Sequence, residues 1–86
     1  MILDIASIAS GSNGNCYYLG DGDDAILVDA GISARQIVER MARLGLSVSR
    51  LRGILISHEH ADHIRGMDVL SRTYAIPVFI DRKSVV

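Results

Sequence analysis

The sequence has little of several features that mark common classes of small protein. Its single cysteine, Cys16, cannot form an internal disulfide, which excludes a disulfide-rich secreted scaffold. No apolar stretch approaches the roughly 18 residues that a membrane helix needs. The N-terminus has no basic segment before its apolar residues, which argues against a secretory signal. These absences predict a cytoplasmic protein without a membrane segment.

The charges are nearly balanced and the chain is short. A formal net charge of -1 provides no global positive field, which argues against a protein that wraps or slides on DNA. A nuclease with local positive groups stays open. The 86 residues make at most one small domain. Because the sequence stops just after a strand-like segment, we expect the natural chain to continue past Val86.

The hydrophobic pattern is typical of an α/β protein. Residues 3–10 roughly alternate between apolar and polar side chains and predict a half-buried strand. Two β-rich segments, 16–19 and 25–29, are joined by Gly and Asp residues, which predicts a hairpin. The apolar segment 53–57 predicts a strand that is buried on both faces, and residues 76–80 predict a last strand.

One helix has clear start and stop signals. Ser33 is a good N-cap, and Gln36 three residues later completes a capping box. Gly45 ends the helix, and between these signals lie apolar residues at helical spacing: Ile37, Val38, Met41 and Leu44. A second helix is predicted within residues 64–75. Because it separates two strands, we expect a right-handed βαβ unit with a parallel strand pair.

All three histidines lie in the histidine segment, residues 58–65 (HEHADHIR). The segment follows a predicted strand, and open α/β sheets bind ligands at the carboxyl ends of strands. His58, His60 and Asp62 share one phase in an extended chain, whereas His63 points elsewhere unless the backbone turns into the helix there. Imidazole and carboxylate are zinc-type ligands. The alternative is a solvated turn with Asp62 as N-cap, but three histidines and an aspartate so close together favour a metal site.

Two motifs resemble those of the metallo-β-lactamase fold superfamily. "SHEHADHIRG" is similar to its HxHxDH signature, and "ILVDAG" (residues 26–31) to its first motif. With "SIASGSNGNCYYL" and "VLSRTYAIPVF", the chain more narrowly resembles the YycJ/WalJ-like branch. The resemblance implies that residues 1–86 are a single partial domain, the N-terminal part of an αββα sandwich in the order β, β-hairpin, α, β, α, β.

The resemblance also implies a metal-dependent hydrolase with two divalent ions, Zn or Mn. In full-length form it would act on DNA as a phosphodiesterase or exonuclease, by attack of a metal-bridging hydroxide. By position in the motifs, His58 and His60 match ligands of the first metal, and Asp62 and His63 match ligands of the second. Asp62 would also orient the hydroxide. Asp29 matches the aspartate that supports the metal loop through hydrogen bonds.

The sequence departs from the family in lacking its later ligands. The later histidine of the first site, the bridging carboxylate and the last histidine are missing, so we expect the chain alone to be inactive. A thioester or lactone hydrolase is the second candidate function. A non-catalytic metal-binding or interaction module is a candidate of another class, and a sheet face left uncovered would favour a homo-oligomer.

Other residues have weaker functional interpretations. Ser57 is either a supporting residue or a strand-end hydroxyl. For "SGSNGNC" we favour a tight turn over a phosphate-binding loop. For Cys16 we favour a small buried apolar residue over a metal ligand or a nucleophile. Arg35, Arg40 and Arg43 form the solvated face of their helix, and Arg65 is a weak candidate for a phosphate contact.

Overall fold

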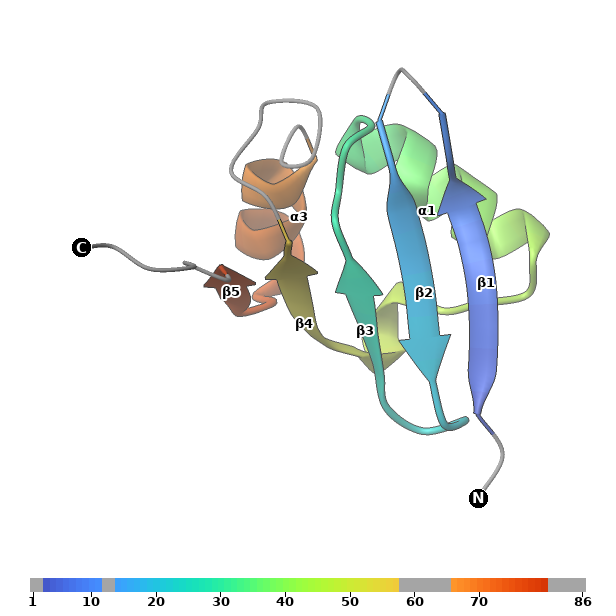
Figure 1. The fold of residues 1–86 in the computed structure, drawn as a ribbon. Coiled ribbons are helices and arrows are strands. Elements are labelled where there is room, and N and C mark those ends of the chain that lie inside the picture. The colour runs from blue at the N-terminus through green and yellow to red at the C-terminus, as the bar shows by residue number, and fades with distance from the viewer. Residues whose placement is uncertain (1–2, 12–13, 58–65, 81–86) are drawn as a thin grey trace.

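A single mixed sheet with helices on one face forms the structure, a computed structural model that describes residues 3–11, 14–57 and 66–80 (Figure 1). The strands lie in sequence order across the sheet. The elements are β1 (Asp4–Ala9), β2 (Cys16–Gly20), β3 (Ala25–Val28), α1 (Ala34–Arg43), the 3-10 helix η1 (Val48–Arg50), β4 (Leu51–Ile56), α3 (Met67–Tyr74) and β5 (Val78–Ile80).

The strand directions divide the sheet into two parts. β1, β2 and β3 pair antiparallel, whereas β3, β4 and β5 pair parallel. The predicted hairpin is confirmed, and so is the parallel pair joined by the second helix. In the hairpin turn, the Asp21 carboxylate accepts hydrogen bonds from the backbone N–H groups of Asp23 and Asp24. The parallel pairing brings the carboxyl ends of β3 and β4 to the same edge of the sheet (Figure 1).

The core lies between the sheet and the two helices. Tyr18, Leu27 and Ile54 point from the sheet into this layer, and Ile37 and Leu70 meet them from α1 and α3. All five are at most 1% exposed. In a chain this short, burial of these apolar side chains is the main favourable contribution to folding.

The predicted boundaries of α1 are confirmed at both ends. The Ser33 hydroxyl accepts a hydrogen bond from the Gln36 N–H, which is the N-cap bond of a capping box. The same hydroxyl donates to Oε1 of Gln36, whereas in a full capping box that side chain bonds the Ser33 N–H. At the other end Gly45 has a φ of 75°, and the Leu46 N–H donates to the carbonyl of Met41. This is the Schellman arrangement, which needs a left-handed residue and explains the glycine.

Two predictions of burial are wrong. Leu55, at the centre of the segment expected to be buried on both faces, is 37% exposed because no described element covers that side of the sheet. Leu44 is 53% exposed, since the helix ends at Arg43 and residue 44 is its C-cap. The helical spacing was correct for Ile37 and Met41, which are fully buried.

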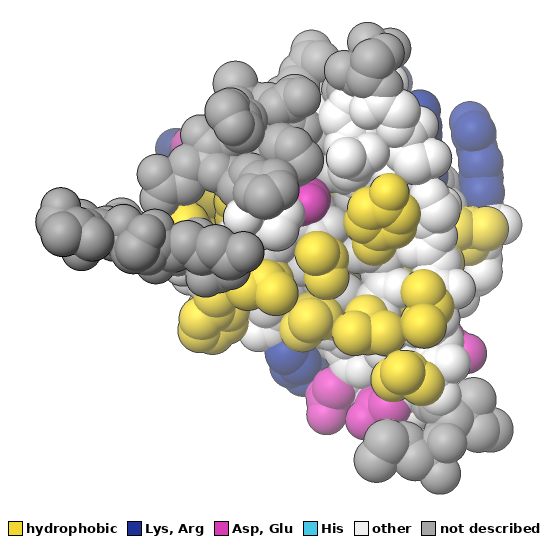
Figure 2. Space-filling model, viewed as in Figure 1, with side chains coloured by type: hydrophobic (Ala, Val, Ile, Leu, Met, Phe, Trp, Pro, Cys, Tyr) yellow, Lys and Arg dark blue, Asp and Glu magenta, His cyan; other side chains and the backbone are white. Residues whose placement is uncertain are grey.

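The uncovered face of the sheet is strongly apolar. The register places Tyr17, Val28, Leu55 and Phe79 side by side across four strands. In β1, Ile5 points to this same face of the sheet and is 73% exposed. Figure 2 shows this face as a band of hydrophobic side chains across the sheet. The expectation of an uncovered sheet face is therefore confirmed for the part of the chain that the structure describes.

Candidate metal centre

The candidate site begins with Asp29, the first residue after β3. It is 5% exposed and has a φ of 65°, a conformation that aspartate tolerates better than most residues. Its backbone N–H still donates to the carbonyl of Leu55 at 2.7 Å, which extends the pairing of β3 with β4 by one residue. The positive φ then turns the backbone away from β4.

The Asp29 side chain bonds to Ser57, the residue immediately before the histidine segment. The Ser57 N–H donates to Oδ1 at 2.8 Å, and the Ser57 hydroxyl lies 3.0 and 2.9 Å from Oδ1 and Oδ2. A charged acceptor strengthens these bonds, and Ser57 is only partly accessible to competing water. The carboxylate therefore holds the end of β4 where the segment begins.

Ala30, the residue after Asp29, bonds to Gly66, the residue that follows the histidine segment. The Gly66 N–H donates to the carbonyl of Ala30 at 2.7 Å. Gly66 is buried, and a Cβ built on it would lie 2.3 Å from the carbonyl oxygen of Ile32. Sequence reasoning missed this contact; its only signal was a glycine where the second helix begins.

The loop between β1 and β2 contacts Gly31, which follows β3. The Asn15 carbonyl accepts a hydrogen bond from the Gly31 N–H at 2.9 Å, and its side-chain oxygen accepts one from the Gly11 N–H at 3.1 Å. Gly11 and Gly14 have φ values of 138° and 128°, and the Gly14 N–H donates to the Gly11 carbonyl. These bonds have the geometry of a tight turn. Asn15 is a second residue that sequence reasoning missed.

The predicted ligands lie outside the residues that the structure describes. They are His58, His60, Asp62 and His63, and Arg65 lies there too. Within residues 3–11, 14–57 and 66–80, no three His, Cys, Asp or Glu side chains come together as a metal site. Of the predicted site residues, the structure therefore brings together the two supporting ones, Asp29 and Ser57.

Cys16 begins β2 and Arg40 lies in the last turn of α1; the charges of Asp29 and Arg40 both act on the Cys16 thiol. Burial raises the pKa of the Cys16 thiol to about 12; the negative Asp29 adds to the increase and the positive Arg40 opposes it. The predicted burial of Cys16 is confirmed, since it is fully buried. The prediction for Arg40 was wrong, because its guanidinium donates to the carbonyl of Ile8 at 3.1 Å and is partly buried. Arg35 and Arg43 are solvated as expected.

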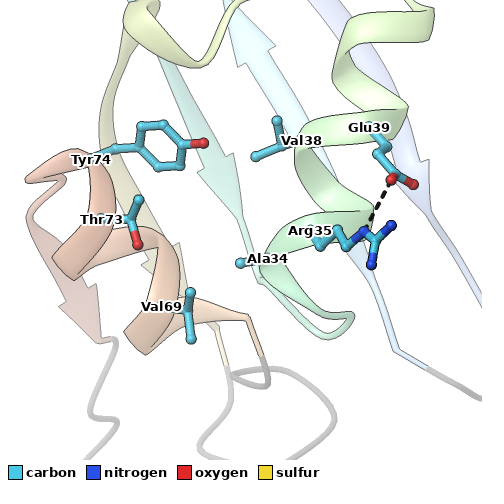
Figure 3. Close-up of a pocket in the computed structure, with 7 residues that line it drawn as sticks. All are labelled: Ala34, Arg35, Val38, Glu39, Val69, Thr73 and Tyr74. Atoms are coloured by element: carbon cyan, nitrogen blue, oxygen red, sulfur yellow. Dashed lines mark hydrogen bonds and ion pairs between the residues drawn. The ribbon is translucent and has the colours of Figure 1, made fainter.

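A separate groove of about 340 Å³ lies between α1 and α3, on the side of the helices away from the sheet (Figure 3). Val38, Val69 and Tyr74 form its apolar part, and the Arg35–Glu39 ion pair lies at one side. Of the predicted site residues that the structure describes, neither Asp29 nor Ser57 lines it. No described helix is long and apolar enough to cross a membrane.

Comparison with known families gives one match over nearly the whole chain. Residues 9–85 match the family model described as the Metallo-beta-lactamase superfamily. Exodeoxyribonuclease YycJ of Bacillus anthracis is 40% identical over 84 residues, which is 98% of this chain and 32% of the relative. Exodeoxyribonuclease WalJ of Streptococcus pneumoniae is 42% identical over 77 residues, or 90% and 29%. The chain thus spans about a third of the length of these relatives.

Solved structures give the same fold. A metallo-beta-lactamase of Cronobacter sakazakii with a HARLDQ motif superposes with a TM-score of 0.76 at 29% identity, over 86% of this chain and 29% of that one. BJP-1, a subclass B3 metallo-beta-lactamase of Bradyrhizobium japonicum, has a TM-score of 0.77 at 24% identity, over 90% and 30%. At this identity the second likeness concerns the fold alone.

Proposed function

This chain belongs to the metallo-beta-lactamase superfamily, and on that premise we propose that it is the N-terminal part of a metal-dependent hydrolase that degrades DNA. The relatives of the YycJ/WalJ branch are named exodeoxyribonucleases. We extend their substrate class, DNA, to the whole protein of which these residues form a part. Residues 1–86 are then a single partial domain.

The bonds between Asp29 and Ser57 carry this proposal. Burial of the Asp29 carboxylate costs desolvation, and the hydrogen bonds from the N–H and the hydroxyl of Ser57 offset that cost and fix the position of Ser57. Here that residue directly precedes His58. Groups that orient metal ligands in this way commonly change metal affinity 10–100-fold when they are removed.

The chemistry of the histidine segment fits divalent metals. We assign His58 and His60 to one ion and Asp62 and His63 to a second, either Zn or Mn. Asp62 also orients the attacking water. Divalent ions bound there would lower the pKa of water and polarise the phosphoryl oxygen. The ions need further ligands, and we propose that these come from outside the 86 residues or from a second copy of the chain.

Metal content measured together with molar mass tests the first part of the proposal. We expect the purified chain to bind zinc, and His58→Ala together with His60→Ala to abolish that binding while the circular dichroism is unchanged. About two ions per chain in a dimer would indicate that a second copy completes the site. No binding by the unaltered chain would contradict completion of the site by a second copy and would leave ligands from outside the 86 residues as the alternative.

Activity assays test the second part, on a protein of the relatives' length that contains these residues. We expect it to shorten DNA from an end in the presence of Mn²⁺, and the 86-residue chain alone to be inactive. No DNA degradation with Mn²⁺ or Zn²⁺, together with fast hydrolysis of a thioester, would favour the second candidate function. Turnover of a phosphodiester by the short chain would show that its ligand set is sufficient.

A further inference from the structure

Near its end, β1 contains one residue more than the strand that pairs with it. Ser7 lies opposite Tyr17 and Ala9 lies opposite Cys16, so the pairing with β2 skips Ile8. This arrangement is a β-bulge, which bends a strand and changes the direction of the chain that follows it. We call the extra residue, Ile8, the β1 bulge.

The β1 bulge allows two successive side chains to enter the core. Side chains of a regular strand alternate between the two faces of a sheet, yet Ile8 and Ala9 are only 4% and 7% exposed. Ala9 lies opposite Cys16, whose side chain is fully buried. Without the bulge Ile8 would take that place and Ala9 would point away from the core. The end of β1 therefore has two alternative registers, one bulged and one regular.

A side chain of α1 bonds to the β1 bulge. The Arg40 guanidinium donates to the Ile8 carbonyl at 3.1 Å, and this contact is partly buried. A charged donor makes a stronger hydrogen bond than a neutral one, and its removal where water has limited access leaves the carbonyl unsatisfied. Arg40 starts from a fixed position, because Ile37 and Met41 beside it in α1 are fully buried and α1 lies behind β1 and β2 (Figure 1).

The chain that leaves the bulge contacts the residues after β3. Two residues beyond Ala9, the Gly11 N–H donates to the side chain of Asn15 at 3.1 Å. The Asn15 carbonyl in turn accepts a hydrogen bond from the Gly31 N–H at 2.9 Å. Gly31 follows the carboxyl end of β3, and open α/β sheets bind ligands at the carboxyl ends of their strands. The register of β1 determines where this loop begins, and so bears on the contact between Asn15 and Gly31.

We propose that Arg40 is a positioning residue: its bond to the Ile8 carbonyl selects the bulged register of β1, and that register brings Asn15 against Gly31 at the carboxyl end of β3. Neither contact involves a metal or a substrate, so this role of Arg40 is independent of the proposed function. A change at Arg40 should be felt at Gly31, through β1 and Asn15.

Amide hydrogen exchange in the 86-residue chain, measured by NMR, tests this role. Arg40→Met keeps an aliphatic side chain but removes the donor. We expect the exchange rate of the Gly31 amide to rise at least ~10-fold relative to that of the Ile54 amide, the factor that loss of one hydrogen bond to a charged group implies. Ile54 is the reference because its N–H donates to Pro77 in the other half of the sheet. A loss of global stability would accelerate both amides and leave their ratio unchanged, and that result would overturn the role of Arg40.

Arg43→Met is the matched control, because Arg43 lies in the same last turn of α1 and is exposed. Both variants remove one positive charge near the end of the helix, but only Arg40 bonds to Ile8. Arg43→Met should change the ratio by less than about twofold. Arg40→Lys retains a positively charged donor and should return the ratio close to that of the unaltered chain. A ratio as high in Arg40→Lys as in Arg40→Met would show that the bond to Ile8 does not select the register.

A measurement on the unaltered chain decides the matter should Arg40→Met fail to fold. A hydrogen-bonded guanidinium rotates slowly, so the Nη protons of Arg40 should give separate NMR signals. As urea is added below the unfolding transition, these signals should merge at the concentration at which the Gly31 amide loses its protection, because the two contacts form together. Merged Arg40 signals with a fully protected Gly31 amide would show that the contacts are independent and would overturn the role of Arg40.

Discussion

The Asp29 carboxylate accepts hydrogen bonds from both the N–H and the hydroxyl of Ser57, at distances of 2.8, 2.9 and 3.0 Å. Two residues before Ser57, the pairing of the two strands is still made by backbone, from the Asp29 N–H to the Leu55 carbonyl. The side chain thus replaces the next backbone acceptor after the main chain has turned away. The two strand ends remain joined although the strands diverge.

Asp29→Asn should weaken both folding and metal binding. An amide keeps the size of the side chain, but only one of its two terminal atoms can accept a hydrogen bond, and the negative charge is lost. We expect the free energy of unfolding to fall by about 1–3 kcal/mol in urea titrations. Zinc affinity should fall about 10–100-fold.

Asp24→Asn is the control for this change, because Asp24 forms an exposed ion pair with Arg52. Surface pairs contribute little, so the unfolding free energy should change by no more than about 1 kcal/mol and zinc affinity should stay the same. Equal losses of zinc affinity in both variants would show that the effect comes from the removed charge and not from the bonds to Ser57.

Ser57→Ala and Ser57→Thr separate the hydroxyl from the backbone of the same residue. Alanine removes the bond from the hydroxyl to Asp29 but keeps the bond from the N–H. We expect a loss of about 1 kcal/mol in unfolding free energy and a weaker affinity for zinc. Threonine retains the hydroxyl and should restore both values to near those of the unaltered chain. A loss in threonine as large as in alanine would indicate that steric fit, and not the hydrogen bond, is what matters.

Local signals in the sequence were sufficient for the elements but not for their contacts. The cap at Ser33 and the stop at Gly45 depend on residues within one helical turn, and both were predicted correctly. The exposure of Leu55 could not be predicted from local signals, because an apolar segment has the same pattern whether or not another layer covers it.

Long-range contacts explain what was missed at the candidate site. Arg40 bonds to Ile8, which is 32 residues away, although its helical position predicted a solvated side chain. The hydrogen bonds of Gly31 to Asn15 and of Gly66 to Ala30 form only once β3 has been placed beside β2 and β4. The family motif predicted that Asp29 supports the metal loop; its bonds to Ser57 are observed, and the role itself stays a prediction.

The Cys16 thiol predicts a loss of stability at high pH. Its pKa rises from an ordinary value of 9.0 to about 12 in the folded protein, because burial disfavours the thiolate. Between these values the unfolded chain loses the proton while the folded chain keeps it. The thiol's contribution is therefore complete below pH 9 and declines as pH rises towards 12, by up to about 1.4 kcal/mol per unit.

Urea titrations at several pH values, with the Cys16→Ala variant as control, measure this contribution. The variant keeps every other titrating group, so the difference between the two proteins isolates the thiol. We expect the unfolding free energy of the unaltered chain to decline more steeply above pH 9 than that of the variant. Parallel curves would show that the thiol ionises with similar ease in the folded and unfolded states.

The apolar face of the sheet predicts self-association of the 86-residue chain. Phe79 is 58% exposed and lies beside Leu55 in the row of apolar side chains across the sheet. Contiguous exposed apolar surface favours contact with another surface of the same kind. In analytical ultracentrifugation, the average mass of the unaltered chain should therefore rise with concentration, and Phe79→Ser should reduce the increase. Val69→Ser is the matched control, because Val69 is 49% exposed but lies on the helical side. An equal effect of both variants, or a mass that does not depend on concentration, would show that the sheet face does not drive association.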